Sequence, residues 1–449
     1  MSEDPRDLLS HGAMTLQQVL VVAITVGLTA LDGFDVLAIS FAAPGIARDW
    51  GIDRAALGFV LSAELFGMAV GSILIGGLAD RIGRRRTMLG CVVVMTLGMA
   101  MAATAKGVYV LGLWRVVTGL GIGGILPASA AAAAEFASLK RRDLSVSLMA
   151  IGYPFGAIAG GLVVAALLKT MHWHVIFEFG AGVTALFIPI VWYWVPESIS
   201  WLCARQPPGA LKRVNGALAR IGRASIERLP PPAPAASGAQ PVPSPGAGTG
   251  ARRAGGIFRA DLVTTTTLVT LTYFLHITTF YFLVKWVPKI VVDLGFAPSA
   301  AAGVLVWTNV GGMSGGAVLG LLTRRFSARA LTIVLLVFST VTVALFGRSQ
   351  PDLARLSFVC AAAGFCTNGA IVGIYAVLAR VFPTDLRASG TGFAIGLGRG
   401  GAVIAPIIAG FLFTAGYALP VVAIIMGVGP LVAAVCLALL RIEPRTAAG

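Results

Sequence analysis

Residues 77–85 read GLADRIGRR, a short basic stretch between two apolar runs at about 55–79 and 86–105. Each run holds roughly 20 residues, which is the length of helix that crosses a bilayer core of about 30 Å. Charged stretches between such runs lie at the membrane surface, because burying Arg or Asp in lipid is costly. This stretch therefore predicts two membrane-spanning helices joined by a short basic loop.

The same alternation continues over the whole chain. Of its 449 residues, 57% are hydrophobic and only 12% are charged, which is too little charge to cover a water-soluble protein of this size. We predict an all-α membrane protein with twelve transmembrane helices in two six-helix bundles. The predicted spans are 16–44, 55–79, 86–105, 108–136, 144–168, 173–195, 262–290, 299–322, 328–347, 352–381, 388–414 and 417–440.

The two halves of the chain repeat weakly. Gly119 and Gly364 lie in the fourth and tenth predicted spans, and Arg142 and Arg387 precede the fifth and the eleventh. Both pairs have the same spacing of about 245 residues. Many transporters are built from paired halves of this kind, with a binding site near the bilayer midplane around which the halves rock.

The predicted domains follow from this repeat. We place one six-helix bundle at 1–197, a second at 262–449, and a polar cytoplasmic linker at 198–261. The linker begins with a basic part and continues with a Pro/Ala/Gly-rich tract from Leu229 to Gly256. Such a composition is typical of a disordered segment.

The distribution of Lys and Arg predicts the orientation. The net charge of +15 arises largely from the linker and from basic clusters at 81–86, 140–142, 324–329 and 441–445. With twelve spans these clusters share one side with both termini, and an excess of Lys and Arg marks the cytoplasmic side. We therefore expect a multi-pass inner-membrane protein with cytoplasmic termini, acting as a monomer. Because the clusters separate apolar runs, they indicate a lipid bilayer as partner and argue against nucleic acid.

Two further motifs carry a resemblance to a known family. The stretch at 77–85, together with RVVTGLGIG at 115–123, resembles the signature of the major facilitator superfamily. The element DGFD at 32–35 is similar to the D-G-x-D element of its aromatic acid:proton symporter family. The resemblance covers the whole chain and implies the major facilitator fold and proton-coupled carriage of a small aromatic acid by alternating access. The equivalent loop at 323–327 departs from the pattern because it lacks an acidic residue.

Four ionisable residues inside the predicted spans are candidates for proton coupling: Asp32, Asp35, Glu64 and Arg115. Asp32 and Asp35 are three residues apart and share a helix face. Apolar surroundings and a neighbouring carboxyl group both disfavour the charged form, so such a group can exchange a proton near neutral pH. Arg115 stays charged and needs an anionic partner, which could be either aspartate, Glu64 or the substrate. Structural capping or ion pairing is the alternative reading.

Arg399 is the favoured ligand for a substrate carboxylate. It lies near the middle of the eleventh span among several glycines, and a guanidinium can clamp a carboxylate with two parallel hydrogen bonds. A structural pair with an acidic residue of the other half is the alternative. Further candidates for substrate contacts, each of which can instead be satisfied by packing against a neighbouring helix, are His276, Asn309, Asn368, Tyr375 and Phe34.

A third group of residues lies near the predicted cytoplasmic ends of the spans. We expect these residues to switch between charge pairs as the protein changes conformation, without touching the substrate. The group comprises Asp80, Arg81, Gly83 and Arg84 in the signature loop, together with Glu135, Arg142 and Arg387 at the ends of later spans.

These features favour a transporter over other classes of protein. No metal-ligand cluster, nucleophile constellation or phosphate-binding loop is evident in the sequence, so we expect neither an enzyme nor a cofactor. The sequence indicates proton-coupled uptake of a small aromatic carboxylate such as a hydroxybenzoate. Two alternatives stay open: a related transporter of another organic anion, such as a muconate-like dicarboxylate or a sugar acid, and a membrane receptor that binds without transporting.

Overall fold

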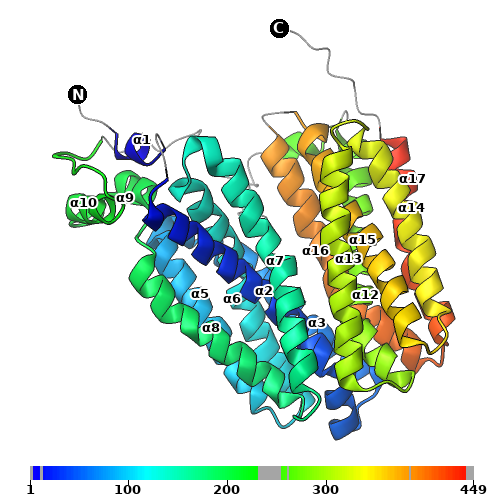
Figure 1. The fold of residues 1–449 in the computed structure, drawn as a ribbon. Helices are drawn as coiled ribbons and strands as arrows, with labels where there is room; N and C mark the ends of the chain where they lie inside the picture. The colour runs from blue at the N-terminus through cyan, green and yellow to red at the C-terminus, as the bar shows by residue number, and fades with distance from the viewer. Residues whose placement is uncertain (1–3, 11–13, 231–253, 260–261, 384–385, 441–449) are drawn as a thin grey trace. The chain divides into compact units, whose positions relative to one another are not determined.

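The computed structural model describes residues 4–10, 14–230, 254–259, 262–383 and 386–440, and within these ranges all regular structure is helical (Figure 1). Twelve of the described helices are long and apolar enough to cross a membrane, as the sequence predicts. These helices are α2 (Leu16–Trp50), α3 (Arg54–Leu74), α5 (Arg84–Ala103), α6 (Val108–Phe136), α7 (Arg142–Leu167), α8 (His174–Trp194), α12 (Val263–Asp293), α13 (Pro298–Leu322), α14 (Ala328–Gly347), α15 (Leu353–Val381), α16 (Arg387–Thr414) and α17 (Leu419–Leu439).

Short helices occupy the surface segments. They are α1 (Pro5–Ser10), α4 (Ala79–Ile82), the 3-10 turn η1 (Leu139–Arg141), α9 (Ile199–Arg205), α10 (Ala210–Arg220) and α11 (Ala254–Ile257). The basic part of the predicted linker thus forms α9 and α10, whereas residues 231–253 of the Pro/Ala/Gly tract and the basic cluster at 441–445 lie outside the described residues.

The second span is shorter than the sequence predicts. Helix α3 ends at Leu74, and a turn follows before the single helical turn of α4. The adjacent residues Gly76 and Gly77 lie in this turn, and glycine disfavours helix because ordering its backbone is entropically expensive. The first span is longer than predicted, because α2 continues past Pro44 to Trp50.

The chain divides into two compact units that interleave along the sequence. The first comprises Met1–Ala38, Ala63–Gly160 and His172–Ala247, and the second comprises Ile39–Ser62, Gly161–Met171 and Gly248–Gly449. In the first unit α5 packs against both α6 and α8; in the second α12 packs against α16 and α17, and α13 against α15. The predicted domain boundaries at 197 and 262 divide the chain into consecutive segments, whereas these units interleave. The boundaries stay a prediction.

Glycines bring one helix pair of each unit into backbone contact. A Cβ atom at Gly119 of α6 would collide with the Glu64 carbonyl of α3, and one at Gly364 of α15 would collide with the Thr308 carbonyl of α13. Small residues allow membrane helices to approach this closely, where packing drives association. The two crossings use positions at about the spacing of the sequence repeat, so the repeat corresponds to repeated helix packing.

Candidate functional site

A buried charge cluster lies inside the first unit. Asp32 and Asp35 come from α2, Glu64 from α3 and Arg115 from α6. The side chains of Asp35, Glu64 and Arg115 are completely buried, and Asp32 is 3% exposed. Ionisable groups at such depth in a membrane protein are expensive, which marks this cluster as a candidate functional site.

Arg115 is the centre of the cluster. Its Nη2 forms an ion pair with the Glu64 carboxylate and also donates a 2.7 Å hydrogen bond to the Asp35 backbone carbonyl. Its Nη1 donates to the sulfur of Met99 at 2.9 Å, and its guanidinium lies 5.4 Å from the Phe177 ring centroid. Of the partners that the sequence left open, the structure selects Glu64, and Arg115 joins five helices of the unit.

The carboxyl group of Asp35 is the member of the cluster best placed to bind a proton. Both of its side-chain oxygens are buried, and neither accepts a hydrogen bond from a described residue. It also lies within electrostatic reach of Asp32, Glu64 and Arg115. Burying a carboxylate without hydrogen bonds carries a large desolvation cost, which proton uptake relieves. Asp35 is therefore the candidate proton-binding group of the cluster, and its side chain is not part of the Arg115–Glu64 pair.

A second polar group lies in the second unit, around Arg399. This half-buried residue of α16 interacts electrostatically with the buried Tyr273 of α12. The Tyr273 hydroxyl lies 3.0 Å from the hydroxyl of Tyr375 on α15, whose side chain is 42% exposed. Gly398 packs against the Tyr273 ring, so α16 approaches α12 closely here. The group offers a guanidinium and two phenol hydroxyls, which suit a carboxylate and a ring hydroxyl.

The remaining predicted substrate contacts are more enclosed. His276 is completely buried, and its Nε2 donates a 2.8 Å hydrogen bond to the Thr367 carbonyl. Asn309 is partly buried and donates to the Leu305 carbonyl of its own helix at 2.8 Å. Phe34 is 4% exposed and packs edge-on against Phe179 at 5.4 Å. Each of these side chains has a structural contact, and their substrate contacts stay predictions.

Asn368 and Lys285 are two further polar side chains of the second unit. Asn368 of α15 is partly buried beside Gly312 of α13, where the absent side chain leaves room for it. Lys285 of α12 is completely buried, although the sequence motifs do not single it out. The sequence signal that could have identified Lys285 is its position inside the apolar run at 280–288. A buried cation on α12 is a second candidate for attracting an anion into this unit.

The signature loop is held by residues that follow α8. Gly83, at the junction of α4 and α5, has a φ of +101°, and a Cβ atom there would lie 2.5 Å from an oxygen of Glu197. Glu197 accepts hydrogen bonds from the backbone N–H groups of Arg85 and Ser198, both at 3.0 Å. Gly83 is therefore favoured by its positive φ, and the Glu197 carboxylate occupies the space beside it. Glu197 is absent from the predicted gating group, because its partners in the loop lie more than a hundred residues away.

Glu135 is the second acidic residue that holds this end of the unit. It forms an ion pair with Arg84 at 3.6 Å, and it accepts hydrogen bonds from the Ser198 hydroxyl and from the backbone N–H of Ser200 at 2.8 Å. The backbone carbonyl of Asp80 accepts bonds from the side chains of Trp201 and Arg205. The start of α9 thus binds both the loop and the end of α6.

The other predicted gating residues are placed as follows. The side chains of Asp80 and Arg81 are exposed. Arg142 begins α7 and donates to the Ala134 carbonyl at 3.0 Å. Arg387 begins α16, the equivalent position of the repeat, and its buried Nε and Nη2 atoms form no hydrogen bond with a described residue. Their role in switching stays a prediction.

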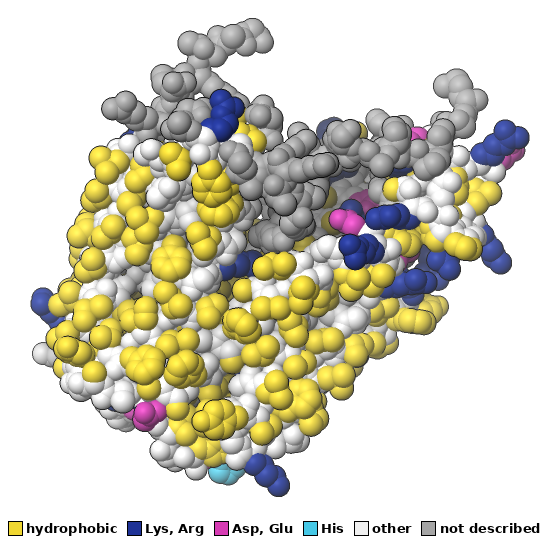
Figure 2. All heavy atoms as spheres, turned by 180° about the vertical axis from the view of Figure 1, so that it is seen from behind, with side chains coloured by type: hydrophobic (Ala, Val, Ile, Leu, Met, Phe, Trp, Pro, Cys, Tyr) yellow, Lys and Arg dark blue, Asp and Glu magenta, His cyan; other side chains and the backbone are white. Residues whose placement is uncertain are grey.

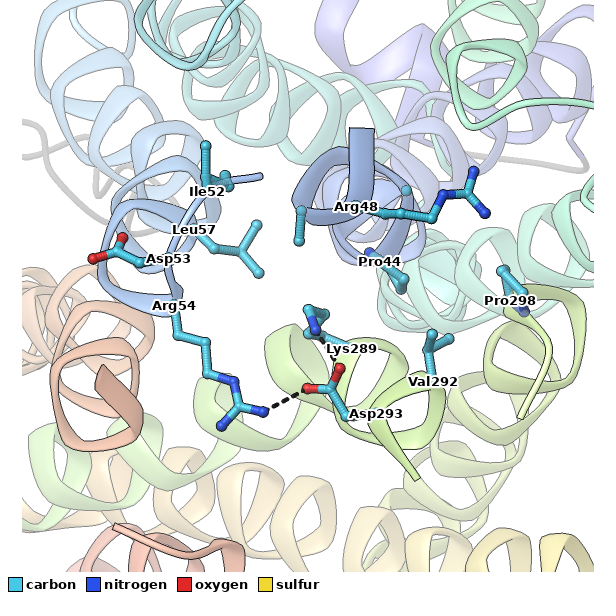
Figure 3. Close-up of a pocket in the computed structure, with 12 residues that line it drawn as sticks. Pro44, Arg48, Ile52, Asp53, Arg54, Leu57, Lys289, Val292, Asp293 and Pro298 are labelled. Atoms are coloured by element: carbon cyan, nitrogen blue, oxygen red, sulfur yellow. Dashed lines mark hydrogen bonds and ion pairs between the residues drawn. The ribbon is translucent and has the colours of Figure 1, made fainter. Parts of the chain in front are cut away.

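A cavity of about 390 Å³ lies in the second unit, at the ends of α2 and α12 and the start of α3 (Figure 3). Arg54, the first residue of α3, donates to Asp293, the last residue of α12, at 3.0 Å. Lys289 forms a second ion pair with the same carboxylate. Figure 3 shows both cations converging on Asp293, whereas Asp53 points away from it. Asp53 instead accepts the backbone N–H of Ala56 and so stabilises the start of α3.

The fold and these buried charges define a polytopic membrane protein of the transporter class. The family model described as Major Facilitator Superfamily matches residues 25–360 and 269–449, and the chain belongs to this superfamily. It is therefore a transporter and not an enzyme, and the resemblance drawn from the signature loop and the DGFD element is confirmed.

Several curated relatives align over most of the chain. A gallate transporter of Pseudomonas putida is 28% identical over 97% of this chain and 94% of its own length. The 4-hydroxybenzoate transporter PcaK of the same species is 30% identical over 90% and 88%, respectively. The 3-(3-hydroxy-phenyl)propionate transporter of Escherichia coli strain K12 is 30% identical over 88% and 87%.

Solved structures of low sequence identity share the fold. A crystal structure of a D-xylose-proton symporter has a TM-score of 0.69 at 17% identity and covers 94% of this chain and 97% of its own. A crystal structure of a variant of the nucleoside transporter NupG has a TM-score of 0.71 at 12% identity and covers 94% and 99%. At these identities the likeness concerns the fold alone.

Proposed function

We propose that the protein is a proton-coupled symporter that takes up a small aromatic carboxylate, such as a hydroxybenzoate, by alternating access. The observation that carries the proposal is the completely buried Asp35 carboxyl group beside the Arg115–Glu64 ion pair. The names of the gallate and 4-hydroxybenzoate transporters, which align over most of the chain, support an aromatic acid as substrate.

The Arg399 group is proposed as the substrate site. A benzoate-like anion would place its carboxylate on the Arg399 guanidinium and a ring hydroxyl near Tyr273 and Tyr375. Charge-assisted hydrogen bonds to a guanidinium are roughly twice as strong as neutral ones, and two parallel bonds also fix orientation. Removing a hydroxyl partner leaves a buried polar group unsatisfied, so this site would discriminate between hydroxylated and bare rings.

The coupling between proton and substrate transport follows from the net charge of the loaded protein. In the outward-facing state, Asp35 takes up a proton while Arg399 binds the substrate anion, and together the two ligands add no net charge. Moving one elementary charge against the membrane potential costs about 2.3 kcal/mol per 100 mV, so a complex loaded with one proton per monoanion crosses more easily than the anion alone. The higher pH of the cytoplasm then removes the proton, and the substrate leaves.

The proposed location is the bacterial inner membrane with both termini in the cytoplasm. The basic residues of the signature loop, of η1 and of α10 all lie on the side of the N-terminus, which is the side that the positive-inside rule assigns to the cytoplasm. The cavity around Arg54 and Asp293 lies at the opposite ends of the spans and would face the outside.

Uptake in proteoliposomes tests the function. With an inside-alkaline pH gradient, purified protein should accumulate labelled 4-hydroxybenzoate, and collapsing the gradient with a protonophore should release it. About 1.4 kcal/mol is stored per pH unit, which sustains a roughly tenfold concentration ratio for one proton per anion. Empty liposomes serve as the control.

The same assay separates the alternatives. Transport of a muconate-like dicarboxylate or a sugar acid, with no uptake of 4-hydroxybenzoate, would reassign the substrate to another organic anion. Saturable binding without any uptake would instead favour a receptor. Both outcomes would contradict the proposed function.

The Arg54–Asp293 pair is proposed as a latch that holds the outer ends of α3 and α12 together. We expect Arg54→Gln and Asp293→Asn each to speed labelling of a cysteine introduced at Ala47, in the cavity wall, about two- to fivefold. The pair is partly exposed, and such pairs contribute roughly 0.2–1 kcal/mol. A membrane-impermeant maleimide is a suitable reagent, because the five native cysteines are all buried.

Two comparisons make the latch test specific. The double variant should label no faster than either single variant, because both substitutions remove the same interaction. Arg355→Gln, which removes an exposed cation of the same unit that does not line the cavity, is the control and should leave the labelling rate unchanged. Additive effects, or an equal effect of Arg355→Gln, would show that general surface charge and not the pair controls access.

A further inference from the structure

A second cavity lies at the cytoplasmic end of the first unit and is strongly basic. It has a volume of about 410 Å³ and is bounded by α5, α10 and the end of α8. Four arginines line it, whereas its lining contains a single carboxylate, that of Glu197. Those arginines are Arg85, Arg86, Arg213 and Arg220.

The single carboxylate is already engaged. Glu197 accepts the backbone N–H groups of Arg85 and Ser198, and its neighbour Gly83 lies against it. Arg86 and Arg220 lie near enough to Arg85 to repel it electrostatically. Holding these positive charges close together costs electrostatic free energy, and an anion bound in the cavity would offset that cost.

The arginine side chains are partly fixed by contacts that leave donors available. Arg85 donates to the Trp192 carbonyl, and its guanidinium lies 5.3 Å from the centroid of the Trp192 ring. Arg220 donates to the Tyr193 carbonyl at 3.3 Å. Neither carbonyl bears a charge, so these two contacts orient the guanidinium groups without neutralising them. Glu197 attracts Arg85, but one carboxylate does not balance four arginines. A guanidinium has five N–H donors and suits the oxygens of a phosphate.

The position of the cavity indicates where its ligand comes from. Trp192, Tyr193 and Trp194 at the end of α8 are 64%, 68% and 44% exposed, and exposed Trp and Tyr at the end of a span mark the membrane–water interface. Beside them, α10 buries Ala210, Val214, Ala217 and Leu218 along one face and exposes basic residues on the other. Figure 2 shows basic side chains gathered at the end of this unit, above a surface of hydrophobic side chains.

We propose that this cavity binds the phosphate headgroup of an anionic phospholipid, such as phosphatidylglycerol, from the leaflet that faces α10. The acyl chains would extend along the apolar surface of α5 and α8, while the phosphate contacts Arg86, Arg213 and Arg220. Basic cavities beside membrane spans bind anionic headgroups in this way. The bound lipid would also secure Arg85, whose backbone N–H holds Glu197 against the signature loop.

Native mass spectrometry of the full-length protein tests the proposal. Wild-type protein released from nanodiscs that contain phosphatidylglycerol and phosphatidylcholine should retain phosphatidylglycerol preferentially. The double variant Arg213→Gln/Arg220→Gln should retain it about 25-fold less, because each of the two basic residues near the surface contributes roughly a factor of five. Both side chains are exposed, so the variant should fold normally.

Three comparisons decide the result. Arg324→Gln/Arg325→Gln removes two equally exposed arginines from the second unit and should leave lipid retention unchanged. Wild-type protein should also be protected against heat by phosphatidylglycerol and not by phosphatidylcholine, and the Arg213/Arg220 variant should lose that protection. Equal retention by both double variants, or equal protection of the wild type by inorganic phosphate alone, would overturn the lipid assignment.

Discussion

Replacing Asp35 with Asn is expected to abolish uphill accumulation of 4-hydroxybenzoate, reducing the accumulation ratio to about one, while substrate exchange at equal pH continues. The amide has nearly the shape of the carboxyl group but cannot exchange a proton, so the coupling free energy of about 1.4 kcal/mol per pH unit is lost. The hydrogen bond from Arg115 goes to the Asp35 backbone carbonyl, and the Arg115–Glu64 pair does not involve the Asp35 side chain, so both should survive.

The measurement is paired uptake and counterflow in the same proteoliposomes, with external pH recorded during uptake. Asp143→Asn neutralises an exposed carboxylate in the first turn of α7 and should behave as wild type. Uphill accumulation by Asp35→Asn, with normal external alkalinisation, would show that Asp35 does not carry the proton. Asp32→Asn would then become the decisive variant, because Asp32 is the nearest alternative on the same helix.

Arg115→Met is expected to be the most destabilising single change in the first unit, costing about 3–5 kcal/mol. It would leave the completely buried Glu64 carboxylate without its cation, and breaking a buried ion pair on one side has a cost of this size. It would also remove the contacts with Met99 and Phe177 that join α6 to α5 and α8. We expect little folded protein and a strongly lowered melting temperature.

A double variant separates the lost charge partner from the lost packing. Arg115→Met/Glu64→Gln removes both charges, so it should recover most of the stability, because replacing both members of a buried pair is often nearly neutral. Thermal unfolding in detergent, followed by size-exclusion chromatography, measures this recovery. Arg355→Met, at an exposed position of α15, is the control. If the double variant is no more stable than Arg115→Met, the packing contacts and not the ion pair dominate.

In the proposed mechanism, the buried Arg115–Glu64 pair would let the first unit bind a proton without rearranging. Arg115 forms its ion pair with Glu64, one of the anionic partners that the sequence left open. Asp35 is thereby left as a carboxyl group whose charge state can change while the rest of the cluster stays fixed. The proposed roles are therefore a structural and electrostatic one for the Arg115–Glu64 pair and proton exchange for Asp35.

Part of the candidate site could be predicted because the free-energy cost of burying a charged side chain in a membrane is evident from its neighbours in the sequence. Asp32, Asp35, Glu64, Arg115 and Arg399 stand out in the sequence, since each interrupts an apolar run in which a charge is expensive. Lys285 carries the same signal and was missed among the aromatic residues of its span. Tyr273 and Glu197 carry no such signal, because a tyrosine is common in membrane helices and Glu197 lies beyond the end of a span.

The sequence by itself determined the twelve spans, their order and the repeat, because the length of an apolar run and its flanking charges depend only on neighbouring residues. Only the tertiary structure decided that Arg115 pairs with Glu64, that Glu197 accepts a hydrogen bond from Arg85 in the signature loop, and that Tyr273 lies near Arg399. These contacts depend on how far each helix is rotated about its own axis. Each residue turns an α-helix by about 100°, and hydropathy alone does not specify that rotation between helices far apart in sequence.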